Sequence, residues 1–382
     1  MACPILHVND VSAIGGAENS LLQLLRGLDR REFEPIVALP RRGPLSEEMG
    51  RLGVPVFFAP MTRLRHTRDP GRLACQAACT LAAASSIARE ARRRRVALIH
   101  AHKTSALPAA GLAARLVGVP CVWHMRDLRR LSWPERRVGR LAEAAIAVSR
   151  AVLKESGIGP GDPEATVISN GIDADEFAAR ARPGEFRREL GLGPSEPLVL
   201  VVAQMAPWKG HGDFLKAFAA VRRSHPTAVA ALAGDDLFGD HPTYVGELRR
   251  LAAVLHLGGA VHFLGYRTDV QTLMADADLL VIPSKAEPFG RVALEAMAVG
   301  RPVVGRRFGG LPEVVEDGVT GRLTAGLSPE ELADAISALL AEPGVRAEMG
   351  AAGRRRVRER FSLGQHADEV SALYRRLLRR RT

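Results

Sequence analysis

Two carboxylates, Glu287 and Glu295, enclose the stretch Glu-Pro-Phe-Gly-Arg-Val-Ala-Leu-Glu and are separated by seven residues. Residues 277–284 predict a buried strand, and residues 292–298 predict a helix. We therefore expect Glu287 at the carboxyl end of a parallel strand and Glu295 one to two turns into the next helix. Because carboxylates accept hydrogen bonds from hydroxyls, one acid could bind a sugar and the other a ribose.

The start of that helix is a candidate phosphate-binding site. Phe289 and Gly290 fall there, where unpaired backbone N–H groups can hold a phosphate. In open α/β sheets, ligands bind beyond the carboxyl ends of the strands. The alternatives are that Glu287 only complements the helix dipole and that Glu295 lies on a solvated helix face.

Strand-like apolar runs alternate with helical runs along the whole chain. The strands are expected at residues 5–8, 36–39, 54–58, 97–100, 120–124, 144–148 and 165–168, and then at 198–203, 228–232, 261–264, 279–282 and 302–305. Such alternation indicates βαβ units and parallel sheets. The fold class is therefore α/β, with two Rossmann-like, doubly wound domains.

The length of 382 residues is enough for two hydrophobic cores. We expect domains at residues 1–175 and 198–364, a linker rich in Pro and Gly at 176–197, and a last helix at 365–382. The Ala-rich run at residues 73–88 lies between basic residues. It favours a buried helix of a Rossmann layer over a surface helix pressed on a membrane.

The net charge of +11 is carried mostly by arginine and mostly by the first half of the chain. Arginine in place of lysine, with abundant Ala and Gly, is typical of GC-rich coding, so the charge does not indicate nucleic acid as a partner. It favours an anionic surface or substrate, including a peripheral contact with an anionic membrane, with a solvated face as the alternative.

Other features of the sequence limit the compartment and the cofactors. No targeting leader and no membrane-spanning apolar run are present, and the four cysteines show no CxxC spacing. A cytoplasmic protein, in solution or at the inner face of the membrane, is expected. Asp235 and Asp236 predict a loop rather than a metal site, so no metal is expected.

Several sequence blocks together resemble the family-4 glycosyltransferases. The run from Val261 to Leu323 carries most of the resemblance, and the upstream blocks fit in order. The upstream blocks are Gly15-Gly16-Ala17-Glu18, Ser169-Asn170-Gly171-Ile172-Asp173 and Pro207-Trp208-Lys209-Gly210. The resemblance implies the GT-B fold, with two domains facing a central cleft and a final helix crossing back toward the first domain.

The resemblance also implies a role for each residue of the block in binding a nucleotide-diphosphate sugar. Glu287 would contact the donor sugar, Glu295 would bind the ribose, and Lys209 would neutralise the leaving diphosphate. Backbone N–H groups at the pyrophosphate would come from Phe289, Gly290 and Arg291. The donor side would also include Gly15, Gly16, Gln204, Tyr266 and Arg267.

One position departs from the family pattern. Gln204 stands where the family usually has an arginine, five residues before Lys209. A glutamine donates hydrogen bonds but carries no charge. The residues expected to compensate for the missing charge are Arg267, Arg291, Arg306 or Arg307.

The first domain is expected to supply a catalytic histidine. His124 ends a strand, and the resemblance implies that it points toward the donor sugar, with a structural, hydrogen-bonded histidine as the alternative. The acceptor side is expected to include His102, Arg126 and Asp127.

The resemblance implies a retaining, metal-independent hexosyltransferase, with UDP favoured as the nucleotide and front-face attack as the hypothesis. The acceptor is expected in cell-surface polysaccharide or glycolipid synthesis, as a sugar or lipid-linked molecule, or as a soluble natural product. Two alternatives are a silent nucleotide-sugar-binding relative, which Gln204 supports, and a sugar-nucleotide epimerase. A dehydrogenase fits the sequence poorly because no GxGxxG follows a strand.

Overall fold

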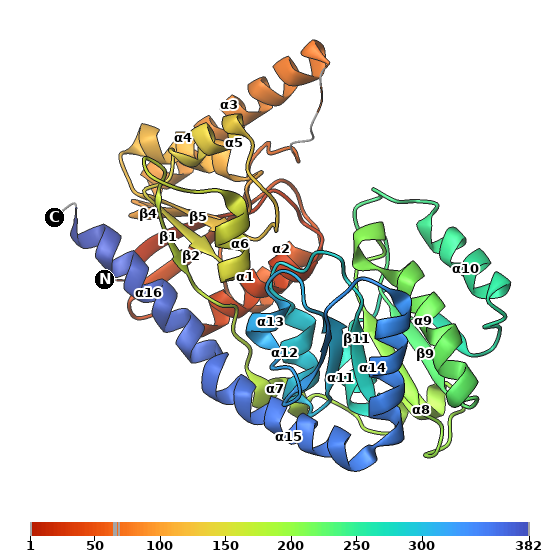
Figure 1. Ribbon diagram of the computed structural model, residues 1–382. Helices are drawn as coiled ribbons and strands as arrows, with labels where there is room; N and C mark the ends of the chain where they lie inside the picture. Colours follow the sequence, from red (N-terminus) through yellow and green to blue (C-terminus); the bar gives the residue numbers. More distant parts are fainter. Residues whose placement is uncertain (1, 64–66, 68, 381–382) are drawn as a thin grey trace. The chain divides into compact units, whose positions relative to one another are not determined.

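The computed structural model describes residues 2–63, 67 and 69–380, and it contains two compact units (Figure 1). The first unit is formed by Met1–Gly171 with Leu363–Thr382, and the second by Ile172–Ser362. Each unit has one parallel sheet with helices around it, as expected from the alternating pattern.

The first unit has a seven-stranded sheet in the order β3-β2-β1-β4-β5-β6-β7. Its elements are β1 (Cys3–Val8), α1 (Gly16–Gly27), β2 (Phe33–Leu39), α2 (Pro44–Arg51), β3 (Val56–Phe58), α3 (Pro70–Arg93), β4 (Leu98–Ala101), α4 (Leu107–Val117), β5 (Cys121–Met125), α5 (Trp133–Gly139), β6 (Ala144–Ala147), α6 (Arg150–Ser156), β7 (Glu164–Val167) and α16 (Leu363–Arg379).

The second unit has a six-stranded sheet in the order β10-β9-β8-β11-β12-β13. Its elements are α7 (Ala174–Ala179), α8 (Glu185–Glu189), β8 (Leu198–Val202), the 3-10 turn η1 (Pro207–Lys209), α9 (His211–Ser224), β9 (Val229–Ala233), α10 (Tyr244–Val254), β10 (Val261–Gly265), α11 (Val270–Asp276), β11 (Leu279–Ile282), α12 (Arg291–Ala298), β12 (Val303–Arg306), α13 (Leu311–Val314), β13 (Gly321–Thr324), α14 (Pro329–Ala341) and α15 (Pro343–Arg360).

In both sheets the direction of winding reverses between two central strands. The neighbours are β1 and β4 in the first unit, and β8 and β11 in the second. The loops that leave such a pair diverge to opposite faces of the sheet, and the crevice between them is where open α/β sheets bind ligands. The sheet order therefore marks one candidate edge in each unit.

The segment expected as a linker is part of the second unit. It contains α7 and α8, and Phe177 and Phe186 are buried. The Asp276 carboxylate accepts hydrogen bonds from the backbone N–H groups of Gly184 (2.6 Å), Phe186 (2.8 Å) and Arg187 (3.1 Å). The structure therefore divides the chain after residue 171 and not after residue 175. This polar segment belongs to the second unit because two aromatic side chains and one buried carboxylate hold it against the core of that unit.

The helix α3 differs in part from the expectation of a buried helix. Its buried residues begin only at Ala83, and the preceding three turns are largely exposed, so the expectation holds for the second half alone. Figure 1 shows the first half projecting beyond the sheet of its own unit. Of the flanking basic residues, Arg65 and Arg68 lie outside the described residues. No described helix is both long and apolar enough to cross a membrane.

The last helix, α16, completes the core of the first unit. Val370, Leu373, Tyr374 and Leu377 are buried with the apolar side chains of α1 and of the sheet. Gly27 of α1 allows this packing, since a Cβ there would lie 2.9 Å from the Ala367 Cβ. The first unit therefore needs the end of the chain to close its core.

We expect Leu373→Ala to lower the free energy of unfolding of the first unit by about 2–4 kcal/mol, because it removes a well-packed side chain and leaves a cavity. Urea unfolding would measure this loss. Arg376→Ala on the same helix removes only an exposed ion pair with Glu164, and it should cost less than about 1 kcal/mol. Equal effects of the two substitutions would show that α16 is not part of the core.

Candidate functional site

The edge of the second unit at β8 and β11 brings together two of the expected site residues, Lys209 and Glu287. Lys209 ends η1 in the loop after β8, and Glu287 lies in the loop after β11. The Lys209 Nζ lies 2.8 Å from Oε2 of Glu287, and both side chains are largely buried. A cation and a carboxylate that are 78 positions apart in the chain thus form one ion pair at the ligand-binding edge.

The backbone explains why these two loops meet. Gly210 has a φ of +76°, and a Cβ at this position would lie 2.1 Å from the carbonyl oxygen of Pro283. The N–H of Lys285 donates to the carbonyl of Trp208 at 2.9 Å. Only glycine allows this close approach, so Gly210 fixes the position of Lys209 over the end of β11.

The start of α12 has the geometry expected of an anion site. Gly290 precedes the helix with a φ of +95°, and a Cβ there would lie 2.8 Å from Cδ1 of Leu311. The first N–H groups of a helix have no intrahelical acceptor and carry a partial positive charge. Phe289 is buried and its ring meets the edge of Phe361, which anchors the loop. The backbone here can therefore approach a phosphate closely.

Glu295 lies on the buried side of α12 and is only 3% exposed. Its Oε1 lies 2.6 Å from Nη2 of Arg291. Burial raises the pKa of the Glu295 carboxyl above its ordinary value, although the charge of Arg291 opposes this shift. The alternative of a solvated helix face is therefore wrong, and Glu295 is a buried, paired acid available to a hydroxyl donor.

The arginines expected to replace the missing charge at position 204 are already paired with carboxylates. Gln204 is partly buried. The four arginines considered as substitutes all have acidic partners: Arg267 pairs with Glu189 and Asp269, Arg291 with Glu295, Arg306 with Asp213, and Arg307 with Asp317. Each of these four arginines, like Lys209 with Glu287, is therefore already paired with a carboxylate.

Tyr266 and Arg267 follow β10, which is separated from β8 by β9 in the sheet. Tyr266 is 47% exposed. The Asp269 and Glu189 carboxylates raise the pKa of Arg267 further above its ordinary value, mainly through hydrogen bonds. Arg267 is thus held as a permanent cation in an ion network of the second unit.

In the first unit, Gly15 and Gly16 open α1 after β1. The N–H of Gly15 donates to Oε2 of Glu18 at 3.0 Å, which caps the helix. Gly16 is exposed and a Cβ there would meet nothing within 4 Å. Neither packing against the described residues nor a positive φ requires glycine at position 16.

His124 lies near the end of β5 and is fully buried. Its Nδ1 lies 3.3 Å from Nη2 of Arg126, whose Nη1 donates to Oδ1 of Asn170 at 3.1 Å. Because a guanidinium can only donate, Nδ1 must accept, and the proton of the neutral ring is on Nε2. The Nε2 has no hydrogen-bond partner within the described chain. Arg126 is itself largely buried and connects His124 to Asn170.

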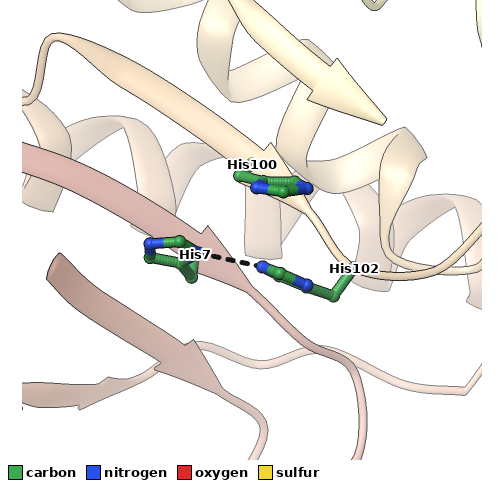
Figure 2. A group of neighbouring side chains, drawn as sticks. All are labelled: His7, His100 and His102. Carbon is green, nitrogen blue, oxygen red and sulfur yellow. Dashed lines mark hydrogen bonds between the residues drawn. The ribbon is translucent and has the colours of Figure 1, made fainter. Parts of the chain in front are cut away.

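His102 belongs to a buried group of imidazoles and not to the surface. His7 of β1 pairs in register with His100 of β4, and His102 follows on the same face of the sheet. Figure 2 shows the three rings side by side, with Nδ1 of His7 2.9 Å from Nε2 of His102. Of the expected acceptor-side residues, Asp127 alone is exposed, and its Oδ2 accepts from Thr104 at 3.5 Å.

These three histidines are the described group whose side chains come closest to a metal-ligand arrangement, with one nitrogen from each within 4.8 Å of the others. Two imidazoles on one tetrahedral Zn²⁺, with Zn–N bonds of about 2.0–2.1 Å, would place their nitrogens roughly 3.3 Å apart. The 2.9 Å contact between His7 and His102 is a hydrogen-bond distance. We interpret the group as neutral, hydrogen-bonded rings.

Two family models match this chain. The family model "Glycosyl transferases group 1" matches residues 184–356, and "Glycosyltransferase Family 4" matches residues 14–176. The chain is 31% identical to the alpha-maltose-1-phosphate synthase of Mycobacterium tuberculosis, over 73% of this chain and 79% of the relative. It is also 31% identical to the D-inositol 3-phosphate glycosyltransferase of Actinosynnema mirum, over 76% and 74% of the two chains.

The chain is a family-4 glycosyltransferase. The crystal structure of Anabaena HepE in complex with UDP and glucose is similar, with a TM-score of 0.80, 28% identity, and coverage of 97% of this chain and 98% of HepE. The fold is thus GT-B, as the resemblance implied.

Sequence reasoning missed the residues that surround the catalytic candidate of this glycosyltransferase. His100 Nδ1 lies 2.5 Å from the Tyr374 hydroxyl, and His366 Nδ1 donates to the carbonyl of Ser169 at 2.7 Å. Tyr374 and His366 both belong to α16. The repeated histidines at the ends of β1, β4 and β5 were a signal, but nothing in the sequence indicated that the last helix covers them.

The buried histidines are held neutral. Burial is the main cause and lowers the pKa of His7 to about 3 and that of His366 to about 4. It also lowers the pKa of His100, His102 and His124 well below the ordinary value, and the charge of Arg126 adds to the shift for these three. Protonation of these rings therefore competes with folding.

We expect the first unit of this glycosyltransferase to lose stability on acidification. A histidine whose folded-state pKa is lowered contributes stability above about pH 6.5, and this is lost as the pH falls toward the folded-state value, by roughly 1.4 kcal/mol per pH unit for each ring. Thermal unfolding from about pH 7.5 to about pH 5.5, with hydrogen exchange to identify the unit, would measure the loss.

His256→Asn is the matched control for this experiment, because His256 is exposed. This substitution should leave the slope of stability against pH unchanged. A first unit that is equally stable at both ends of that pH range would contradict neutral rings in the folded state.

Proposed function

We propose that this protein is a retaining hexosyltransferase that transfers a sugar from a UDP-sugar to an acceptor in cell-surface polysaccharide or glycolipid synthesis. The ion pair of Lys209 with Glu287, beside the open start of α12, is the observation that carries the proposal. The arrangement supplies a cation, a hydroxyl acceptor and backbone donors at one edge of one sheet.

The leaving diphosphate is where charge develops during the reaction. In the proposed mechanism, Lys209 donates to its oxygens, and the N–H groups after Gly290 stabilise the remaining charge. Preorganised donors of this kind lower the barrier because they need no reorganisation as the bond breaks. These groups take the part that a metal ion plays in other transferases.

The two acids have different proposed partners. Glu287, 9% exposed and next to Lys209, accepts hydrogen bonds from hydroxyls of the donor sugar. Glu295, inside α12 and paired with Arg291, accepts from the ribose hydroxyls. Glu287 is thus near the bond that breaks and Glu295 is near the nucleoside, so substitution of Glu295 should affect nucleotide affinity more than the chemical step.

Retention is proposed to follow from front-face attack. The bond from the anomeric carbon to the diphosphate oxygen breaks, and the acceptor oxygen bonds on the same face. The acceptor proton passes to the departing phosphate oxygen. The proposal gives Glu287 no nucleophilic role, since its ion pair with Lys209 lowers its availability for attack. In this proposal the Nε2–H of His124 donates to the donor sugar.

UDP is favoured as the nucleotide by similarity to HepE, whose structures contain UDP and UDP-glucose. Membrane-linked acceptors are supported by the exposed, Ala-rich first half of α3 and the basic residues near it. A soluble acceptor remains the alternative outcome of an acceptor screen.

A catalytically silent, nucleotide-sugar-binding protein is a second candidate function. The observation that favours it is the uncharged Gln204, together with the carboxylate partners of the four nearby arginines. The two experiments below separate binding from catalysis.

Thermal unfolding with UDP-, GDP-, ADP- and dTDP-glucose tests the donor. We expect UDP-glucose to stabilise the protein, by about 2.7 kcal/mol when present at about 100 times its dissociation constant. Glu295→Ala should remove most of this effect, because the ribose loses its acceptor. Stabilisation by GDP-glucose alone would overturn the choice of nucleotide, and no response to any of the four would overturn the proposed function.

Turnover of UDP-glucose, measured as UDP release, tests catalysis. We expect Lys209→Gln to lower kcat by about 10²–10³, because one preorganised donor to the leaving group is lost. Lys216→Gln is the matched control, since Lys216 is exposed on α9, and it should keep full activity. Donor binding without UDP release by the unmodified protein would favour the silent relative.

A further inference from the structure

A further polar group lies at the β1 and β4 edge of the first unit. Asp10 follows β1 by two residues and is only 4% exposed. Neither of its carboxylate oxygens has a hydrogen-bond partner within the described chain. Folded proteins pair nearly all buried polar groups, so a buried carboxylate with two unpaired oxygens requires an explanation.

Asp10 lines a small open pocket. The walls come from the start of α4, with Ala106 and Ala109, and from the middle of α3, with Thr80. The enclosed volume is about 10 Å³, which is the room that one water-sized group needs. Most of the lining side chains are small, Met61 being the exception, and they leave this space beside the carboxylate.

The start of a helix lies near the Asp10 carboxylate. The first turn of α4 faces it across the pocket, and the partial positive charge of a helix start favours an anion. This field reduces the cost of the buried charge but supplies no hydrogen bond to either oxygen. The carboxylate is thus still able to accept from an incoming group.

We propose that this pocket is a subsite for the acceptor, in which Asp10 accepts hydrogen bonds from the hydroxyls of a sugar or from the ammonium group of an amino sugar. This inference rests on the proposed function. The edge between β1 and β4 is the ligand-binding position of the first sheet, and the donor residues Lys209, Glu287 and Glu295 all belong to the second unit.

The chemistry of the subsite excludes one class of acceptor group. Asp10 is the only charged side chain among the described residues that line the pocket. A phosphate or carboxylate there would face a like charge with no cation in the lining to offset it, and like charges at contact distance are strongly unfavourable. The end of the acceptor that enters this pocket therefore carries no negative charge, even where another part of the molecule does.

Asp10→Asn tests the subsite because it keeps the size and removes the charge, and Asp10→Ala removes the acceptor atoms as well. The probes are methyl α-D-glucopyranoside, D-glucosamine and D-glucose 1-phosphate, followed by saturation-transfer NMR on the full chain. We expect the glucoside, glucosamine or both to bind and Asp10→Asn to weaken that binding about tenfold or more. Preferential binding of glucosamine would identify the ammonium as the group at Asp10.

Thermal unfolding of the same variants separates binding from a structural role. If Asp10 only supports the fold, its substitution lowers the melting temperature. If it is an unpaired, functional charge, Asp10→Asn leaves the melting temperature equal or raises it while binding is lost. Glu34→Gln, an exposed carboxylate of β2, is the matched control and should change neither measurement.

Three results would overturn the subsite: no binding of either the glucoside or glucosamine, equal binding by Asp10→Asn, or tighter binding of glucose 1-phosphate that still depends on Asp10. The response to UDP-glucose in these variants distinguishes the two proposals. If the donor binds and Asp10→Asn has no effect on the sugars, the subsite fails alone. If sugar binding depends on Asp10 but no nucleotide sugar binds, the proposed function fails and the sugar site stands.

Discussion

The close approach of the loop after β8 to the end of β11 is the constraint on which the donor side depends. Gly210 meets the carbonyl of Pro283 at a distance that leaves no space for a Cβ, and this contact sets Lys209 against Glu287. Without it, a lysine in an exposed loop would sample many positions and lose side-chain entropy on each binding event. A single backbone contact thus converts a flexible cation into a preorganised one, which is the property that stabilises a leaving group.

The first unit depends on a different constraint, the exclusion of water from a row of imidazoles. β1, β4 and β5 place these rings on one face of the sheet, and α16 covers them with Tyr374 and His366. Their neutrality is a consequence of burial first and of neighbouring positive charge, including that of Arg126, second. His124 therefore owes its tautomer to Arg126 and its low pKa to burial under a helix from the far end of the chain. The C-terminal segment contributes to the electrostatics of the candidate catalytic residue as well as to the core.

Periodicity was sufficient to predict the fold, because parallel strands buried on both faces are continuous apolar runs. All twelve expected strands correspond to strands of the structure, whereas β13 was missed because its four residues, Gly-Arg-Leu-Thr, include a single large apolar side chain. Glu287, Lys209 and Gly290 could be named as candidates because they lie within short motifs. Asp10, Tyr374 and the histidine row could not, since their significance comes from contacts between positions far apart in sequence and from the absence of a partner, which no local pattern encodes.

The polar groups at the two edges differ in whether they already have a partner within the chain. At the donor edge the acids are already paired, Glu287 with Lys209 and Glu295 with Arg291, so a ligand that offers an anion for the cation and a hydroxyl for the acid suits both members of a pair. A sugar diphosphate offers both, whereas a free sugar offers only hydroxyls and cannot compensate for a separated ion pair. In the first unit, the Asp10 carboxylate and the Nε2 of His124 have no partner to displace within the described chain. The polar groups at the edge of the second unit are thus paired within the chain, whereas these two groups of the first unit are left to accept from or donate to an incoming group.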